Sequence, residues 1–230
     1  MEAIKTISII IPTYNEKENI AEIISRIKAS LGAAGIDYEI LVVDDASADG
    51  TADIAQVSLE GKGRVLRRVA QARSLSLSVL DGIKQANGEA VVVMDADGSH
   101  PPELIPRLIE VLKNGKGLAV ASRYVKKGGS DNFPLIRRMI SRFACLVGRL
   151  VTKINDNTSG FFCIRKSALV GVDLAPQGFK IGLEIFAKAN YNSFEEVPYI
   201  FVNRKRGKSK LNSKPVFQYI FQVLNLIKNK

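Results

Sequence analysis

Val91-Val92-Val93-Met94-Asp95-Ala96-Asp97 decides the fold, because an apolar run of strand type ends there in two carboxylates one residue apart. Side chains alternate along a strand, so residues i and i+2 face one side, and Asp95 and Asp97 can address one point in space. Two carboxylates on one side repel each other unless a cation lies between them. Mg²⁺ and Mn²⁺ take oxygen ligands and usually share them with substrate phosphates, and open α/β sheets bind ligands at the carboxyl ends of their strands. The stretch therefore favours a metal-bridged diphosphate, and a solvated turn is the alternative that it leaves open.

On both sides of this stretch, apolar runs of strand type alternate with patterns of helical spacing. We expect strands at residues 7–11, 38–43, 64–69, 90–94 and 117–122. We expect helices that begin at Asn15, after Asp49-Gly50-Thr51, at Leu75 and at Pro101. Asn15 and Glu18 have the spacing of a capping box at the start of the first helix. This alternation predicts an α/β fold with a mainly parallel sheet that is flanked by helices.

The pattern loosens after Tyr124, where residues 126–132 have the glycine and charge content of a mobile loop. A long helix is predicted from Leu135 to Ile154, with apolar residues on one side and arginines over much of the rest. Shorter elements follow: strands at residues 161–164 and 194–202, and a helix at 182–189. Residues 216–227 are apolar almost all round but too few to span a bilayer. No linker or repeat divides the chain, so we expect a single domain.

Composition narrows the class of protein. The 230 residues are 46% hydrophobic, which fits a globular chain, and the formal net charge is +10. A basic surplus suits nucleic acid, anionic lipid or phosphorylated substrates. The two cysteines lack metal-type spacing and are expected to be buried and reduced, consistent with a cytosolic location. No secretory signal precedes the first strand, and no apolar run reaches the roughly 20 residues of a membrane span.

Acidic residues follow three successive strand units, and the carboxyl ends of parallel strands lie on one edge of a sheet. Glu16 comes after the first unit, Asp44 and Asp45 after the second, and Asp95 with Asp97 after the fourth. We interpret these acids as ligands of ribose hydroxyls, base edges and metal. The alternative is that Asp45 and Glu16 cap helices.

Basic residues are predicted at the same edge. Arg123 ends the fifth strand, and Arg204, Arg206, Lys208 and Lys210 lie on a glycine-containing segment. Arginine and lysine clamps neutralise phosphate charge, although a basic loop is also a common solvated surface. His100, the one histidine, stands next to Ser99 and two prolines and could be catalytic. Because no Ser/His/Asp or Cys/His arrangement occurs, we interpret it as structural or as a support of the site residues. No Walker-type loop or dinucleotide glycine fingerprint occurs, which disfavours P-loop and Rossmann cofactor enzymes.

Six motifs together carry a resemblance that covers roughly Ile7 to Leu211. They read Ile11-Pro12-Thr13-Tyr14-Asn15-Glu16, Val42-Val43-Asp44-Asp45-Ala46-Ser47-Ala48-Asp49-Gly50-Thr51, Met94-Asp95-Ala96-Asp97-Gly98-Ser99-His100-Pro101-Pro102, Ser122-Arg123-Tyr124, Thr158-Ser159-Gly160-Phe161-Phe162 and Arg204-Lys205-Arg206-Gly207-Lys208-Ser209-Lys210-Leu211. The chain resembles the family 2 glycosyltransferases of GT-A fold. Within them it is similar to the polyprenyl-phosphate sugar synthases, in particular the dolichyl-phosphate mannose synthases. The His-Pro-Pro tail and the last motif point to this lipid-phosphate branch.

The resemblance implies a role for each matching residue. Pro12, Tyr14, Glu16, Val43 and Asp45 would line the nucleotide pocket. Asp95 and Asp97 would hold Mg²⁺ or Mn²⁺ and the diphosphate, with the Ala96 backbone nearby and Ser99 where relatives often have glutamine. Arg123, Arg137 and Ser141 would meet the acceptor phosphate, and Arg204 and Lys210 would close over the diphosphate. Residues 1–124 would form the nucleotide-sugar half of the domain, and residues 125–230 the acceptor and membrane-facing half.

The implied reaction is a metal-dependent, inverting transfer of a hexose, foremost mannose from GDP-mannose, to a polyprenyl (dolichyl) monophosphate. Its partners would be the nucleotide sugar, the lipid phosphate, an anionic membrane surface and a membrane-embedded subunit, without nucleic acid. The enzyme would bind peripherally to the cytoplasmic face. The chain departs from its relatives at Arg73-Ser74-Leu75-Ser76, where they carry a glycine-rich segment, and at Ser99. Many relatives also continue into transmembrane helices.

Other functions stay open at this point. A UDP-glucose-dependent polyprenyl-phosphate glucosyltransferase would share most of these motifs. A family 2 enzyme that extends a surface glycan would need a carboxylate base, for which Asp156 is the candidate. A nucleotidyltransferase is disfavoured because its glycine-rich nucleotide loop is missing. A basic binding module for nucleic acid or membrane would not need clustered acids at strand ends.

Overall fold

The computed structural model describes residues 4–69, 73–131, 134–175, 180–202 and 214–228. The strands are β1 (Thr6–Thr13), β2 (Asp37–Asp44), β3 (Gly63–Arg67), β4 (Ala90–Val93), β5 (Leu118–Ser122), β6 (Gly129–Asp131), β7 (Phe162–Arg165), β8 (Phe194–Pro198) and β9 (Ile200–Val202). The helices are α1 (Ile20–Ala33), α2 (Thr51–Leu59), α3 (Leu75–Gln85), α4 (Ile105–Lys113), α5 (Leu135–Gly148), α6 (Ile181–Lys188) and α7 (Lys214–Lys228), with short 3₁₀ turns at Pro102–Leu104 and Lys166–Leu169.

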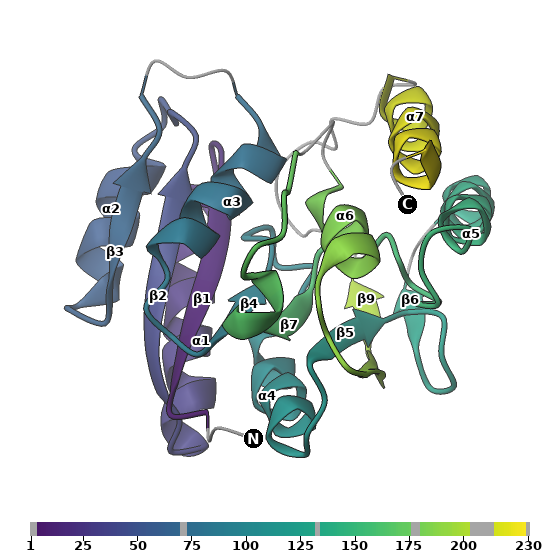
Figure 1. Cartoon of the computed structure of the whole chain (residues 1–230). Coiled ribbons are helices and arrows are strands. Elements are labelled where there is room, and N and C mark those ends of the chain that lie inside the picture. The colour runs from purple at the N-terminus through teal and green to yellow at the C-terminus, as the bar shows by residue number, and fades with distance from the viewer. Residues whose placement is uncertain (1–3, 70–72, 132–133, 176–179, 203–213, 229–230) are drawn as a thin grey trace.

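Seven of the strands form one twisted sheet in the order β3-β2-β1-β4-β7-β5-β8 (Figure 1). The pairs β3-β2, β2-β1, β1-β4 and β5-β8 are parallel, and β7 runs antiparallel between β4 and β5. The prediction of a mainly parallel α/β sheet is therefore confirmed. Thr13 pairs with Asp44 at the carboxyl ends of β1 and β2, so the residues that follow both strands meet at one edge.

Helices cover both faces of the sheet, because alternate residues of its buried strands point to opposite sides. On one face α1, α2 and α4 pack against a core that includes Ile9, Ile11, Val42 and Val92. On the other face α3 and α6 pack against Ile10, Leu41, Val91 and Val93. Four residues in a row on β4 are buried, as expected for a strand covered on both faces.

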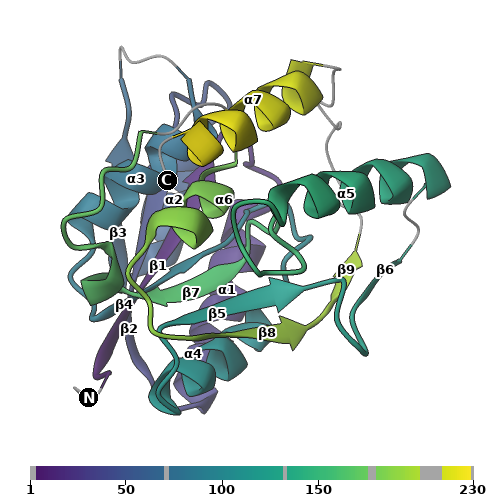
Figure 2. The same ribbon diagram turned by 45° about the vertical axis from the view of Figure 1, so that its right-hand side comes forward.

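The second half of the domain adds a smaller layer at one end of the sheet. β6 pairs in parallel with β9 in a separate two-stranded sheet. Beyond it α5 and α7 lie side by side, away from the β1-β2-β3 end of the molecule (Figure 2). α5 fully buries only Cys145 and Gly148, and Ala144 and Val147 pack partly against the cluster that it shares with α7. Its large apolar side chains from Leu135 to Phe143, and Leu146, are exposed.

The first helix begins at Ile20, so the predicted start at Asn15 and the capping box with Glu18 are wrong. Asn15 has a φ of 55°, which is left-handed backbone that cannot belong to an α-helix. Its amide donates to Ser47 Oγ at 2.9 Å, and its Oδ1 accepts from the Ala48 amide at 3.2 Å. Asn15 therefore joins the loop after β1 to the loop after β2 instead of capping a helix.

The long helix ends at Gly148 and not at the predicted Ile154. A side chain at Gly148 would lie 2.3 Å from Asn157 Oδ1 and 2.4 Å from the Tyr219 hydroxyl, so the chain passes very close to both. Asn157 Nδ2 donates to the Cys145 carbonyl at 2.8 Å and satisfies one of the last carbonyl groups of α5. Contacts between residues far apart in sequence thus end the helix.

Two further boundaries differ from the predictions. The strand predicted at residues 194–202 is divided by Tyr199 into β8 and β9, which belong to different sheets. The segment predicted as a mobile loop at residues 126–132 contains β6, which is short but paired. Cys145 and Cys163 are free and buried, as predicted.

Candidate functional site

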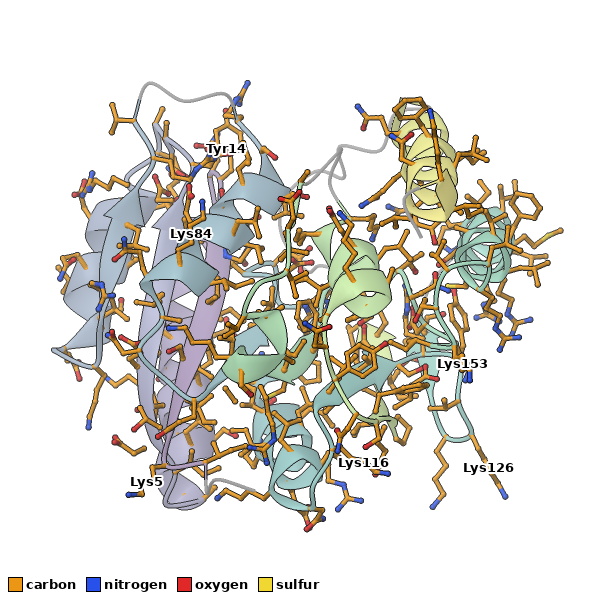
Figure 3. The ribbon with its side chains drawn as sticks, viewed as in Figure 1. Lys5, Tyr14, Lys84, Lys116, Lys126 and Lys153 are labelled. Atoms are coloured by element: carbon orange, nitrogen blue, oxygen red, sulfur yellow. The ribbon has the colours of Figure 1, made fainter. Side chains whose placement is uncertain are left out.

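The site is a cavity of about 440 Å³ at the carboxyl ends of β4 and β5. Tyr14, just beyond β1, is labelled near the same edge in Figure 3, whereas Lys5 and Lys116 lie at the opposite edge. Residues from five separate segments form the polar part of the cavity lining: Asp95, Asp97, Ser99, His100, Arg123, Arg137, Thr158, Ser159 and Lys180. Apolar residues of α3, β4, β7 and α6 line the rest.

Asp95 and Asp97 both line this cavity, as the i, i+2 spacing predicted. Gly98 has a φ of 78°, which turns the chain after the pair, and the Ser99 amide donates to Asp97 Oδ1 at 3.0 Å. The Asp95 side chain remains 39% exposed. Ser99 and the Ala96 beside the pair are buried. Among the described residues no three His, Cys, Asp or Glu side chains converge on one point, so two carboxylates form the acidic part of the site.

His100 is buried and holds the backbone of this acidic pair in place through the Asp95 amide. It is 3% exposed, and its ring stacks on Phe161 with 5.1 Å between centroids. The Asp95 amide donates to His100 Nδ1 at 2.9 Å, so Nδ1 carries no proton and the N–H lies on Nε2, 3.9 Å from Asp95 Oδ2. Burial lowers the pKa of His100 and outweighs the opposing effect of Asp95 and Asp97. A neutral, structural histidine agrees with the interpretation made from the sequence.

Arg123 lies in the cavity wall, but its guanidinium is held by Asp156. Arg123 Nε and Nη2 donate to the two Asp156 oxygens at 2.8 and 2.7 Å, and the Arg123 amide adds a third bond at 2.9 Å. Asp156 is fully buried and the Arg123 side chain is 11% exposed. Burial alone would lower the pKa of Arg123, but the hydrogen bonds and charge of Asp156 raise it above its ordinary value. This pair leaves Asp156 unsuited to act as a base toward a substrate hydroxyl.

Arg137 and Ser141, expected to act together, lie one turn apart on α5, and only Arg137 is among the residues that line the cavity. Arg137 lines the cavity from the first turn of α5. Ser141 is absent from the lining residues and hydrogen-bonds Tyr124, where it counters the rise that burial causes in the pKa of that phenol.

Lys180 is a residue of this site that the sequence reasoning missed. It immediately precedes α6 and lines the cavity, and its Nζ donates to the Thr158 carbonyl at 2.9 Å. Burial lowers the pKa of Lys180, and Arg123 lowers it further, against the opposing effect of Asp95. No motif of charged residues surrounds it in the sequence. The only local signal was its place at the start of a predicted helix.

The residues expected at the nucleotide lie on the neighbouring strands β1 and β2. Pro12 of β1 is paired with Val43 of β2, and both are buried. Tyr14 and Glu16 follow β1. Asp45 accepts from Arg68 Nη1 at 2.5 Å and from the Ser74 amide at 2.8 Å. The part of the chain that the structure describes forms a cavity that none of these five residues lines: Pro12, Tyr14, Glu16, Val43 and Asp45. Their part in nucleotide binding stays a prediction.

Both acids contact residues at helix starts. Glu16 receives the Asn19 and Ile20 amides on its backbone carbonyl, both at 3.0 Å, and its carboxylate accepts from Asn19 Nδ2 at 2.7 Å. The Asp45 carboxylate accepts from the amide of Ser74, the residue that caps α3, at 2.8 Å.

The segment that departs from the relatives adopts ordinary backbone. Ser74 has a φ of −161° and caps α3, where its Oγ accepts from the Leu77 amide at 3.3 Å. Arg73 stacks over the Tyr14 ring with 4.5 Å between Cζ and the centroid. Arg204 and Lys210, expected over the diphosphate, lie outside the described residues.

Two dolichol-phosphate mannosyltransferases are similar to this chain over almost all of its length. The chain is 48% identical over 227 residues to the dolichol-phosphate mannosyltransferase of Pyrococcus furiosus, and the match covers 96% of this chain and 64% of that protein. It is 36% identical over 231 residues to the protein of the same name from Saccharomyces cerevisiae, covering 95% of this chain and 86% of the relative. The chain thus spans somewhat less than two thirds of its archaeal relative.

Solved structures share the fold at low sequence identity. Mannosyl-3-phosphoglycerate synthase from Rubrobacter xylanophilus matches with a TM-score of 0.75 and 18% identity, over 97% of this chain and 74% of that chain. Glucosyl-3-phosphoglycerate synthase from Mycobacterium tuberculosis, in complex with Mn²⁺, UDP-glucose and phosphoglyceric acid, matches with a TM-score of 0.69 and 21% identity, over 98% and 79%. The expected GT-A fold is confirmed. The glycosyl transferase family 2 model matches residues 8–175, and the chain belongs to that family.

Proposed function

We propose that this chain transfers a hexose, foremost mannose from GDP-mannose, to the phosphate of a polyprenyl (dolichyl) monophosphate with inversion at the sugar carbon. One observation carries the proposal: a single cavity combines the Asp95-Asp97 pair with the cations of Arg137 and Lys180, while the buried carboxylate behind its wall, Asp156, is held by Arg123. The names of the relatives from Pyrococcus and Saccharomyces support the same reaction.

Two carboxylates that face one cavity fit a hard divalent cation, because their oxygens are the ligands that Mg²⁺ and Mn²⁺ prefer. Asp95 and Asp97 would hold the ion. When bound, it supplies positive charge for the leaving diphosphate. The mycobacterial synthase of the same fold binds Mn²⁺ together with UDP-glucose, which supports this assignment. The Ser99 amide holds the Asp97 carboxylate, and His100 holds the backbone amide of Asp95.

The acceptor in this reaction needs positioning and not deprotonation. A phosphate monoester is ionised near neutral pH, since its second pKa is about 6. Its oxygen can attack the sugar carbon directly, and the bond to the nucleotide diphosphate breaks on the opposite side. A glycan hydroxyl would need a general base within hydrogen-bond reach. The full burial of Asp156 and its bonds to Arg123 therefore favour the lipid-phosphate reaction over glycan extension.

The acceptor would be met at a membrane surface. Exposed apolar side chains gather on α5 and α7: Leu135, Ile136, Met139, Ile140, Phe143 and Leu146 on α5, and Phe221, Leu224 and Ile227 on α7. Arg138 and Arg142 lie on α5 among them, as in helices that rest in the bilayer interface. No helix in the described part of the chain has the length and hydropathy to cross a bilayer. We propose peripheral binding at the cytoplasmic face, with a membrane-embedded subunit as a further partner.

Product analysis tests this function. The purified chain would be incubated with Mg²⁺ or Mn²⁺ and radiolabelled GDP-mannose or UDP-glucose, and with dolichyl phosphate or an oligosaccharide as acceptor. We expect label from GDP-mannose in the lipid phosphate fraction. Label from UDP-glucose in that fraction would assign a glucosyltransferase instead. Label only in the oligosaccharide would overturn the lipid acceptor.

A further inference from the structure

Asn157 is buried where α5, α7 and the connection before β7 meet. Its Nδ2 donates to the Cys145 carbonyl at 2.8 Å and to the Ile154 carbonyl at 3.2 Å. Carbonyl groups only accept hydrogen bonds, so Nδ2 must face them and Oδ1 must face the other way. There the Tyr219 hydroxyl of α7 donates to Oδ1 at 2.9 Å. Three hydrogen bonds therefore fix the direction of this amide.

Close packing holds Tyr219 against the amide. Tyr219 is 5% exposed and belongs to the apolar cluster that α5, α6 and α7 share. α5 and α7 lie side by side there (Figure 2). A side chain at Gly148 would lie 2.4 Å from the Tyr219 hydroxyl, so α5 admits this contact only because its last residue is glycine.

The two neighbours of Asn157 in the chain hold cations of the cavity lining. Asp156 binds the Arg123 guanidinium, and Thr158 Oγ1 accepts from Arg123 Nη2 at 2.9 Å. The Thr158 carbonyl accepts from Lys180 Nζ at 2.9 Å. Consecutive Cα atoms are about 3.8 Å apart, so the place of Asn157 limits where both neighbours can lie. Asn157 is thus linked to two lining residues, although it is not among the residues that line the cavity.

A second contact from α7 reaches the same cavity wall. Gln222 is buried, and its Nε2 donates to the Lys180 carbonyl at 3.1 Å. Gln222 follows Tyr219 by three residues, and residues at this spacing share one face of a helix. One face of α7 therefore contacts the wall twice, at Asn157 in the connection before β7 and at Lys180 before α6.

From these contacts we propose that Asn157 is a positioning residue. Held by Tyr219, it fixes the connection before β7 so that Arg123 and Lys180 keep their places in the cavity during hexose transfer. This role rests on the proposed function, because it assigns the two places a part in that reaction. Asn157 acts through its neighbours and contacts no reacting group.

The connection has a further anchor that does not involve α7. Glu196 of β8 accepts from the Asn155 amide at 2.9 Å and from the Asp156 amide at 3.0 Å. Tyr219→Phe removes one hydroxyl and keeps the ring that packs in the cluster. With the Glu196 anchor in place, this variant should stay folded while the position of the Asn157 side chain loosens.

The Arg123 Nε–H group reports on the wall without requiring turnover. It donates to Asp156 at 2.8 Å within a buried ion pair, so its exchange with water requires the wall to open. ¹⁵N NMR measures the exchange rate, and the signal is assigned by its loss in Arg123→Lys. The test variant is Tyr219→Phe. The control, Leu226→Ala, removes a larger buried group from the same cluster. Thermal unfolding gives the Tm of each.

We expect Tyr219→Phe to raise the exchange rate by about tenfold, the factor that one hydrogen bond supplies. Leu226→Ala should lower Tm more, because truncation of a core leucine leaves a cavity, yet it should change the exchange rate less. Exchange rates that follow the order of Tm, or an unchanged rate in Tyr219→Phe, would overturn the inference. If Tyr219→Phe proves unfolded, Asn157→Ser is measured in its place with the same criteria.

The product assay, run with a short, water-soluble prenyl phosphate, separates this inference from the proposed function. Tyr219→Phe should lower kcat/KM by about tenfold, and Leu226→Ala should lower it less. A wild-type chain that transfers no hexose to a lipid phosphate, with faster exchange in Tyr219→Phe, would refute the function and support the fixing of the wall by Asn157. A wild-type chain that makes the lipid product, at a rate unchanged in Tyr219→Phe, would support the function and refute the positioning role.

Discussion

Arg68 and Asp45 form a buried ion pair beneath the loop after β2, with 2.5 Å between Nη1 and Oδ1 and side-chain exposures of 3% and 8%. Arg68 Nε also donates to Asp81 of α3 at 2.9 Å. One guanidinium thus ties the end of β2, where the nucleotide is expected, to the helix that covers the sheet. The pair is a structural support that also fixes the direction of the Asp45 carboxylate.

Removal of Arg68 should cost stability because it leaves the Asp45 carboxylate buried without its cation. We expect Arg68→Met to lower the free energy of unfolding by about 3–5 kcal/mol in urea titrations. The neighbouring Arg67→Met breaks an exposed pair with Asp53 and should cost at most about 1 kcal/mol. Equal costs for the two variants would contradict a structural role for the buried pair.

The proposed metal site at Asp95 and Asp97 can be tested by mutation. Asp97→Asn removes one charge of the proposed ion site and should keep the fold while lowering kcat by about two orders of magnitude, the effect of losing one electrostatic contact to the leaving group. In fluorescence titrations, GDP affinity of this variant should no longer respond to Mn²⁺. Asp37→Asn, at the amino end of β2, serves as the control and should behave like the wild type. Full wild-type activity in EDTA would refute the metal assignment.

The acceptor side is tested by Arg137. Arg137→Ala should raise KM for a short, water-soluble prenyl phosphate by about tenfold and change KM for the nucleotide sugar little, because its proposed partner is the acceptor phosphate. Arg107→Ala removes an exposed arginine of α4 and should change neither. A soluble acceptor needs no membrane, so the assay separates phosphate binding from membrane binding. If Arg137→Ala uses the soluble acceptor as well as the wild type, the assignment of Arg137 is wrong.

We expect the exposed apolar surface of α5 to bind membranes. Phe143→Ser should weaken flotation with anionic vesicles at low salt, because a ring that is 59% exposed in the chain would be buried in the bilayer interface. Val57→Ser, on α2, changes a residue that is 78% exposed and should not affect flotation. Turnover of the soluble prenyl phosphate should be the same in both variants. Equal flotation of all three proteins would argue against α5 as the membrane contact.

Local patterns were sufficient to predict most of the fold. Buried strands such as β4 are continuous apolar runs, and amphipathic helices such as α1 show their spacing directly. The convergence of Asp95 and Asp97 followed from the same logic, since it depends on residues two apart. These features are local, so a single sequence contains them.

Features that depend on distant contacts could not be read in this way. Arg123 and Asp156 are 33 residues apart, and nothing near either one indicates that they pair. The end of α5 depends on Asn157 and Tyr219, and the place of Lys180 depends on the close approach of Gly182 to Ser159. Periodicity also does not reveal that β7 runs against its neighbours, because an apolar strand has the same pattern in either direction.

The reversed direction of β7 has an architectural consequence. A parallel strand contributes to the ligand edge with the residues that follow it, whereas β7 contributes the residues that precede it, Thr158 to Gly160. This part of the cavity wall is therefore encoded upstream of its strand, in the connection from α5. In the proposed function this wall faces the acceptor, so sequence changes in the connection would remodel the acceptor side while the parallel strands β1 to β4 stay unchanged. One scaffold would in this way be adapted to new acceptors independently of its donor.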